Sequence, residues 1–154
     1  MDFQQKLTTD KVTDAYPAEL LYVEPDVSVA EVLGLLKQNR RGCMLICRDG
    51  RLVGIFTERD AIKMMAGGDN FGQPISAVMR PAPKTMTADD TVSNAIKAMH
   101  FGGYRRLPIV DDAGRPLGHI SLRRLVRYLA ANFPTLVYTL PPTPHHTPQD
   151  REGA

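Results

Sequence analysis

The sequence predicts an α+β fold in which two copies of a β-α-β-β-α unit pack against each other. The first observation is a repeated motif, because residues 54–60 read GIFTERD and residues 118–124 read GHISLRR. The second is the pattern around each motif, which follows a short apolar run and precedes apolar residues at helical spacing. One unit of about 55 residues is too small to close a core alone, so the two copies are expected to pack together.

Each copy is expected to open with a short extended piece and a helix. The extended pieces lie at residues 21–23 and 84–86, and the helices begin at Ser28 and Thr91. Ser28 and Glu31 form a capping box, and apolar residues then recur on one helical face. Gly42 and the pair Gly102–Gly103 mark the expected ends of the two helices.

A β-hairpin is then expected to lead into the repeated motif. Its first strand lies at residues 43–47 or 107–110 and is followed by a polar turn. The second strand ends at Thr57 or Ser121, where the last helix of the unit begins. Such a corner places a hydroxyl beside free backbone N–H groups at the positive end of a helix dipole, an arrangement that binds anions.

These elements divide the chain into five segments. Residues 1–11 form an N-terminal arm, 12–66 the first repeat, 67–74 a glycine-rich linker, 75–131 the second repeat and 132–154 a proline-rich tail.

Composition argues against several classes of function. The net charge is +2 from 19 basic and 17 acidic residues, which is too small to indicate a nucleic-acid partner. No apolar run approaches the ~20 residues of a membrane span, and the N-terminus lacks the apolar core of a signal peptide. We therefore expect a cytoplasmic protein that does not bind membranes.

Neither metal binding nor catalysis is predicted. Cys43 and Cys47 lie on one expected strand, roughly 13 Å apart, too far for a mutual disulfide or a shared metal ion. The pair His145–His146 lies in the tail without a third ligand, and His100 and His119 each stand alone in apolar stretches. No pairing of a nucleophile with a base and no Walker-type loop is present in the sequence, so we expect no enzyme activity.

Three pieces of the sequence carry a family resemblance: VEPDVSV at residues 23–29, GIFTERD at 54–60 and RLPIVD at 106–111. In this order and spacing they resemble a tandem pair of cystathionine-β-synthase (CBS) domains over residues 10–131. The resemblance implies a flat module in which the two repeats pack as a pseudo-twofold pair, with two clefts between them. It also implies a ligand of the adenine-nucleotide class, such as AMP, ADP or ATP, with NAD and S-adenosylmethionine as further possibilities.

For the first cleft, the resemblance assigns Asp60 to the ribose hydroxyls and Thr57 to the phosphate. A carboxylate offers two acceptors to a vicinal diol, which suits this role. The adenine wall would come from the other repeat, and Arg105 and Arg106 would face the phosphates. The candidate residues are Ile55, Thr57, Arg59, Asp60, Lys84, Thr85, Tyr104, Arg105, Arg106 and Pro108.

An alternative stays open for the same residues. Thr57 and Asp60 also fit an ordinary helix N-cap, which a helix that binds nothing would need as well. Arg105 and Arg106 could equally be a solvated pair at the entrance of a strand. The convergence of all four groups on one cleft favours ligand binding.

The second cleft departs from the family pattern. Ser121 keeps the hydroxyl, but Arg124 stands where the ribose acid would be, and Arg123 adds a second cation at a helix start. Cations there oppose the helix dipole by roughly 0.3 to 1 kcal/mol. A bound polyphosphate could offset that cost, but the missing acid favours an empty or weakly binding cleft. The candidate residues are Leu21, Tyr22, Cys43, His119, Ser121, Arg123 and Arg124.

Two functions remain after these exclusions. The first is a nucleotide-sensing module that regulates an unidentified protein partner, and the alternative is a dimerisation or scaffold module that needs no ligand. A homodimer is expected in both cases, because the last helices of the repeats carry more apolar residues than one core needs. These residues are Met64, Met65, Leu125, Tyr128 and Leu129.

Overall fold

The computed structural model describes residues 3–133, so the tail beyond Phe133, with His145 and His146, lies outside the described residues. In chain order the elements are α1 (Phe3–Thr9), η1 (Val12–Asp14), β1 (Tyr22–Val23), α2 (Val29–Asn39), β2 (Cys43–Arg48), β3 (Arg51–Thr57), α3 (Glu58–Gly67), η2 (Ile75–Ala77), β4 (Arg80–Pro81), β5 (Met86–Thr87), α4 (Val92–Gly102), β6 (Arg106–Val110), β7 (Pro116–Ser121) and α5 (Leu122–Asn132).

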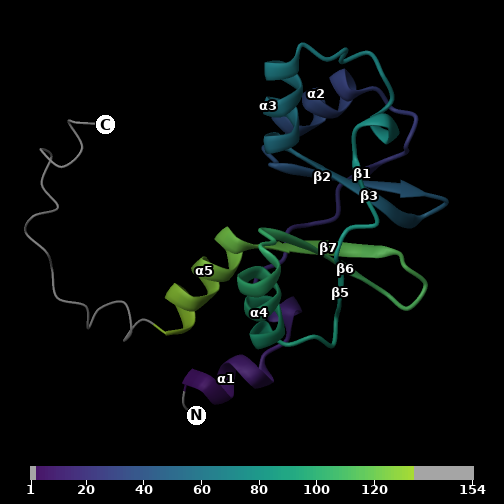
Figure 1. The fold of residues 1–154 in the computed structure, drawn as a ribbon. Coiled ribbons are helices and arrows are strands. Elements are labelled where there is room, and N and C mark those ends of the chain that lie inside the picture. The colour runs from purple at the N-terminus through teal and green to yellow at the C-terminus, as the bar shows by residue number, and fades with distance from the viewer. Residues whose placement is uncertain (1–2, 134–154) are drawn as a thin grey trace, which may run out of the picture.

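The fold is α+β, as the sequence predicts, with one sheet for each repeat. The first sheet has the strand order β1-β2-β3-β4 and the second has the order β5-β6-β7. Both predicted hairpins form, since β2 pairs antiparallel with β3 and β6 with β7. In Figure 1 the two sheets occupy the middle of the molecule, with α2 and α3 beyond the first sheet and α4 and α5 beyond the second.

The leading segment of each repeat crosses over to the other repeat. Val12 and Ala15 are buried in the core that α4, β6, β7 and α5 form, whereas Ile75 is buried in the core of the first repeat. The strand β4 accordingly extends the first sheet by pairing with β3, and Ala18 forms a bridge with His119 of β7. The packed units therefore differ from the sequence repeats, and each unit holds a piece of the other copy.

The glycine that opens each motif makes room for the crossing segment. A Cβ atom at Gly118 would lie 2.6 Å from the carbonyl oxygen of Ala18, and one at Gly54 would collide with the sulfur of Met79. A side chain at Gly118 would push the crossing backbone away from the sheet, whereas one at Gly54 would displace the Met79 side chain and press on the carbonyl oxygen of Arg80 at 3.2 Å. The repeated glycine thus fixes the approach of the segment that borders each cleft.

The helix ends agree with the sequence prediction in part. Ser28 accepts a hydrogen bond from the backbone of Glu31, but the reciprocal half of the predicted capping box is absent. The helix α2 ends at Asn39 rather than at Gly42, because Arg40 adopts the left-handed conformation (φ 54°) and its N–H returns to the last carbonyls. Gly103 ends α4 in the same way, as the sequence predicts.

Three of the five residues on which the predicted dimer surface rests are buried, so the prediction was wrong for those three. Met64, Leu125 and Tyr128 are buried in the cores of their own units. Tyr128 also donates a hydrogen bond to Asp10, which ties the N-terminal arm to α5. The apolar residues that α3 and α5 do expose are Ile62, Met65, Leu122 and Val126.

Candidate functional site

Two clefts open where the repeated motif of one unit meets the crossing segment of the other. The first cleft has a volume of about 360 Å³ and is bordered by the β3–α3 corner, the segment around β4 and the loop that joins α4 to β6. Its lining residues are Ile55, Thr57, Arg59, Arg80, Pro81, Ala82, Pro83, Lys84, Gly103, Tyr104, Arg105 and Arg106.

Most of the residues predicted for the first cleft lie in its lining. Among the described residues, those that line it as expected are Ile55, Thr57, Arg59, Lys84, Tyr104, Arg105 and Arg106. Pro108 is buried in β6 opposite His119, and Thr85 is partly buried beside β5, so neither belongs to the lining. Asp60, the third residue of α3, is also absent from the lining, and its side chain is 11% exposed.

The carboxylate of Asp60 already has partners on both oxygens. Oδ2 accepts hydrogen bonds from the backbone N–H of Thr57 at 3.0 Å and from its hydroxyl at 3.1 Å. Oδ1 pairs with the guanidinium of Arg80 through Nη2 at 3.0 Å and Nε at 3.1 Å. The capping pattern is therefore real, and a ribose diol could reach this acid only by displacing Arg80.

The crossing segment supplies cleft residues that the sequence interpretation missed. Arg80, Pro81, Ala82, Pro83 and Gly103 line the first cleft in addition to the predicted residues. The interpretation did not assign residues 80–83 to a cleft, because the exchange of segments between repeats is not visible in a motif. These residues directly precede the expected strand at 84–86, and this position could have indicated that they line the cleft.

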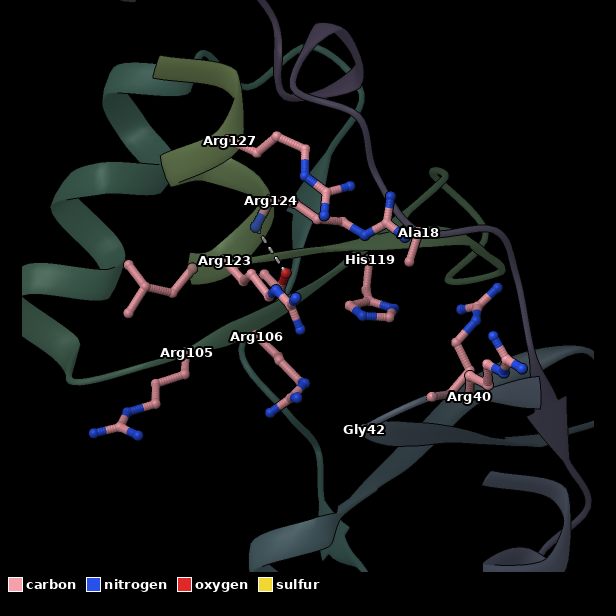
Figure 2. A pocket seen from close by; sticks show the side chains of 12 residues that line it. Ala18, Arg40, Gly42, Arg105, Arg106, His119, Arg123, Arg124 and Arg127 are labelled. Atoms are coloured by element: carbon pink, nitrogen blue, oxygen red, sulfur yellow. Dashed lines mark hydrogen bonds between the residues drawn. The ribbon is translucent and has the colours of Figure 1, made fainter. Parts of the chain in front are cut away.

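The second cleft is the counterpart at the β7–α5 corner and has a volume of about 450 Å³. It is lined by Ala18, Arg40, Arg41, Gly42, Arg105, Arg106, His119, Ser121, Leu122, Arg123, Arg124 and Arg127. Figure 2 shows Arg123, Arg124 and Arg127 of α5 on one side of His119 and Arg40, which follows α2, on the other. Arg105 and Arg106 line both clefts.

Four of the seven residues predicted for the second cleft line it: His119, Ser121, Arg123 and Arg124. The structure does not place Leu21, Tyr22 and Cys43 in the lining. Leu21 packs against the first core and Tyr22 is exposed on β1. The missed residues are Ala18, Arg40, Arg41, Gly42, Leu122 and Arg127. Arg127 lies one helical turn after Arg124 and could have been found from that spacing.

The arginines of the second cleft have no acidic partners within the described residues. The ion pairs of residues 3–133 involve Lys6, Lys11, Arg80 and Arg115, none of which lines this cleft. Two of the arginines are held by backbone carbonyls instead. Arg41 donates to the carbonyl of Glu19 at 2.8 Å, and Arg124 donates to that of Tyr16 at 2.8 Å.

Cys43 and His119 form a buried contact between the two sheets. The sulfur lies 3.6 Å from Nε2 and 3.9 Å from Nδ1 of the imidazole. Burial raises the pKa of Cys43 to about 11, and burial together with Arg106, Arg41 and Arg124 lowers the pKa of His119 to about 4. Both groups are neutral near pH 7, so the pair lacks the thiolate that a nucleophilic cysteine needs.

No group of three His, Cys, Asp or Glu side chains within residues 3–133 is placed to hold a metal ion. None of the helices described combines the length and apolar character that crossing a membrane requires.

The chain belongs to the CBS domain family, whose sequence profile matches residues 12–67 and 75–131. A 17.7 kDa protein of Acidianus ambivalens without an assigned function is 32% identical over 120 residues, or 77% of this chain and 73% of that protein. Among solved structures, CBSX2 in complex with AMP has a TM-score of 0.70 at 22% identity, covering 79% of this chain and 97% of CBSX2. The CBS domain pair of protein MJ0100, in complex with 5-methylthioadenosine and S-adenosyl-L-methionine, has a TM-score of 0.70 at 24% identity, covering 76% and 97%.

Proposed function

We propose that this chain is a nucleotide-sensing CBS module whose first cleft binds an adenine nucleotide and thereby regulates a protein partner. The observation that carries the proposal is the first cleft, which combines an apolar wall, a half-exposed aromatic ring and cationic side chains. The AMP, 5-methylthioadenosine and S-adenosylmethionine bound by the two structural neighbours all contain adenosine, which supports the same class here. A cytoplasmic site of action is part of the proposal.

Each part of the nucleotide has a suitable group in the first cleft. Tyr104 is 41% exposed there, so its ring offers a face on which a base can stack. Asp60 accepts the ribose hydroxyls once Arg80 has moved away from its Oδ1 atom. Arg80, Arg105 and Arg106 then face the phosphate, because an arginine fork matches the geometry of phosphate oxygens.

A ligand in this cleft can change the shape of the module because both repeats line it. The β3–α3 corner belongs to the first repeat, and residues 80–84 and 103–106 belong to the second. A nucleotide that contacts both will favour whichever arrangement of the two repeats it binds more tightly. The regulated partner would sense that change in arrangement.

The direct test is calorimetric titration of the full chain with AMP, followed by ADP, ATP, NAD and S-adenosylmethionine. We expect micromolar binding, roughly 8 kcal/mol, for at least one of them. Tyr104→Ala should weaken that binding about tenfold, because stacking on an aromatic ring contributes about 1 to 3 kcal/mol. Tyr22→Ala is the matched control, since Tyr22 has a similar exposure of 46% and lines neither cleft.

A ligand-independent scaffold remains the second candidate function, and it rests on the exposed apolar residues of the last helices. Ile62 and Met65 of α3 line a groove with Leu33 and Leu36 of α2, and α5 exposes Leu122 and Val126. We propose that a second copy of the chain packs on these faces. Light scattering should then give about twice the 17.1 kDa chain mass. The scaffold function is favoured if the chain dimerises but no adenine compound raises its melting temperature.

A further inference from the structure

The two clefts can be compared residue by residue, because the repeats align at an offset of 63 residues before Ala113 and of 64 after it. In the hairpins Cys43 pairs with Thr57, and Arg106 pairs in the same way with Ser121, which sets the equivalent positions. On this basis Arg41 replaces Tyr104, His119 replaces Ile55 and Arg124 replaces Asp60. These three groups suit a nucleoside in the first cleft. In the second cleft each is thus replaced by an imidazole or a guanidinium.

The lining of the second cleft is uniformly basic, and the carboxyl of Glu58 lies near Gly42 and Arg106 without forming an ion pair there. Seven arginines line it, no carboxylate does, and none of the seven forms an ion pair with a described acidic residue. In the first cleft, by contrast, Arg80 is paired with Asp60. Like charges gathered in a partly enclosed cavity repel one another more strongly than they would in open water. An anion with several charges would remove that repulsion.

The donors come from three parts of the chain. Arg40 and Arg41 follow α2, Arg106 begins β6, and Arg123, Arg124 and Arg127 lie on α5. Figure 2 shows Arg105, which precedes β6, directed away from His119. Ser121 accepts a hydrogen bond from the N–H of Arg124 through its oxygen, so its hydroxyl proton remains available to a ligand. The volume of about 450 Å³ falls in the range of small-molecule sites rather than that of an extended nucleic-acid surface.

We infer that the second cleft is a receptor for a compact anion with three or more phosphate groups, held through its phosphates alone. The cleft lacks the acid that would accept a ribose diol and the ring that would stack on a base, so it distinguishes ligands by phosphate number. The sequence interpretation favoured an empty or weak cleft because Arg40, Arg41 and Arg127 were not recognised as part of it. The inference concerns a different cleft from the proposed nucleotide site and does not depend on it.

The test uses inorganic tripolyphosphate, which has neither base nor ribose, titrated into the full chain by calorimetry. Wild type should bind one tripolyphosphate per chain, more tightly than orthophosphate, with an affinity that falls as salt rises. The double variant Arg123→Gln/Arg127→Gln should lose tripolyphosphate affinity by about tenfold or more, since charge-assisted hydrogen bonds are stronger than neutral ones. Both arginines are exposed on α5, and no hydrogen bond or ion pair of their side chains is formed within residues 3–133.

A matched control distinguishes binding at the second cleft from attraction to the positive charge of the chain as a whole. Arg48→Gln/Arg51→Gln removes the same charge from an exposed hairpin end that lines neither cleft, and it should change tripolyphosphate affinity by less than about twofold. An equal loss in both double variants would overturn the inference, as would the absence of tripolyphosphate binding to wild type. Displacement of tripolyphosphate by oligothymidine more readily than by ATP would assign the surface to nucleic acid and also overturn it.

AMP titrations on the same samples keep the two proposals apart. Arg123→Gln/Arg127→Gln should leave AMP affinity unchanged if AMP occupies the first cleft. Binding of tripolyphosphate without any binding of AMP would remove the proposed nucleotide site and leave this inference standing. Because Arg105 and Arg106 line both clefts, bound AMP should weaken tripolyphosphate binding to some extent, whereas complete displacement of one ligand by the other would overturn the inference.

Discussion

In the first cleft a carboxylate lies at the start of α3, where it caps the helix and pairs with Arg80. At the equivalent place in the second cleft, the start of α5 carries Arg124, whose side chain reaches across to the carbonyl of Tyr16. The backbone around the two positions is the same: a hairpin, a glycine beneath a crossing segment and a helix start. The comparison teaches that a duplicated backbone can keep its geometry while a few side chains replace the acid and the ring of one site by cations in the other.

The largest expected effect follows from removing the acid that distinguishes the first cleft. Asp60→Ala should weaken AMP binding about 100-fold, because hydrogen bonds to a charged group contribute about 1.5 to 3 kcal/mol each. It also removes one half of the capping box with Thr57, which should cost about 1 kcal/mol of unfolding free energy. Tripolyphosphate binding should not change. Calorimetry on a sample shown to be folded checks this, and wild-type AMP affinity in the variant would remove Asp60 from the site.

The next prediction concerns pH and compares His119 with Ile55. The pKa of His119 is lowered to about 4 in the folded chain, chiefly by burial, from an ordinary value near 6.5. Between these values the unfolded chain binds a proton that the folded chain does not. The free energy of unfolding should therefore be greatest above pH 6.5 and fall toward pH 4, by up to ~1.4 kcal/mol for each pH unit.

The substitution His119→Ile gives the second repeat the isoleucine that the first repeat has at the equivalent position, Ile55. The free energy of unfolding should then depend less on pH. Denaturant unfolding of both proteins between pH 4 and 7 measures the difference, in which the contributions of the carboxyl groups largely cancel. Identical slopes for the two proteins would show that His119 does not titrate as the buried site requires.

The smallest effect is expected at a position away from both clefts. Tyr128 is buried and donates a hydrogen bond to Asp10, while the equivalent Met64 of α3 lies in an apolar core. Tyr128→Phe should cost about 1 kcal/mol of unfolding free energy. It should also raise the pKa of Asp10, which this hydrogen bond and Lys6 hold below its usual value. Urea unfolding and NMR titration test the two effects, and neither ligand affinity should change. An unaltered Asp10 pKa would contradict the prediction.

Much of the fold could be predicted from the sequence because it depends on local signals. The duplicated motif, the turns between paired strands and the hydroxyl at each helix start determine the hairpins and the corners. The corner residues Thr57 and Ser121 were identified for the same reason, since the N-cap geometry depends only on the next three residues.

The remainder depends on contacts between distant parts of the chain. The pairing of Arg80 with Asp60 arises because the second repeat lends a strand to the first sheet. Arg40 and Arg41 belong to the second cleft because α2 ends three residues before the predicted glycine, which turns both side chains toward it. Neither arrangement has a local signal, so the net charge of the second cleft could not be derived from the sequence.

The measurement that tests the central claim most directly is the number of AMP molecules bound per chain. It is compared between wild type and a variant whose second cleft carries side chains of the first. Wild type should bind one AMP, displaced by adenosine and not by tripolyphosphate. The double variant Arg41→Tyr/Arg124→Asp gives the second cleft the ring and the acid of the first, so calorimetry should return two AMP per chain and weaker tripolyphosphate binding. Its melting temperature must be recorded, because both arginines also hold backbone carbonyls. Two equivalent AMP molecules per wild-type chain would contradict the claim that these side chains make the clefts unequal.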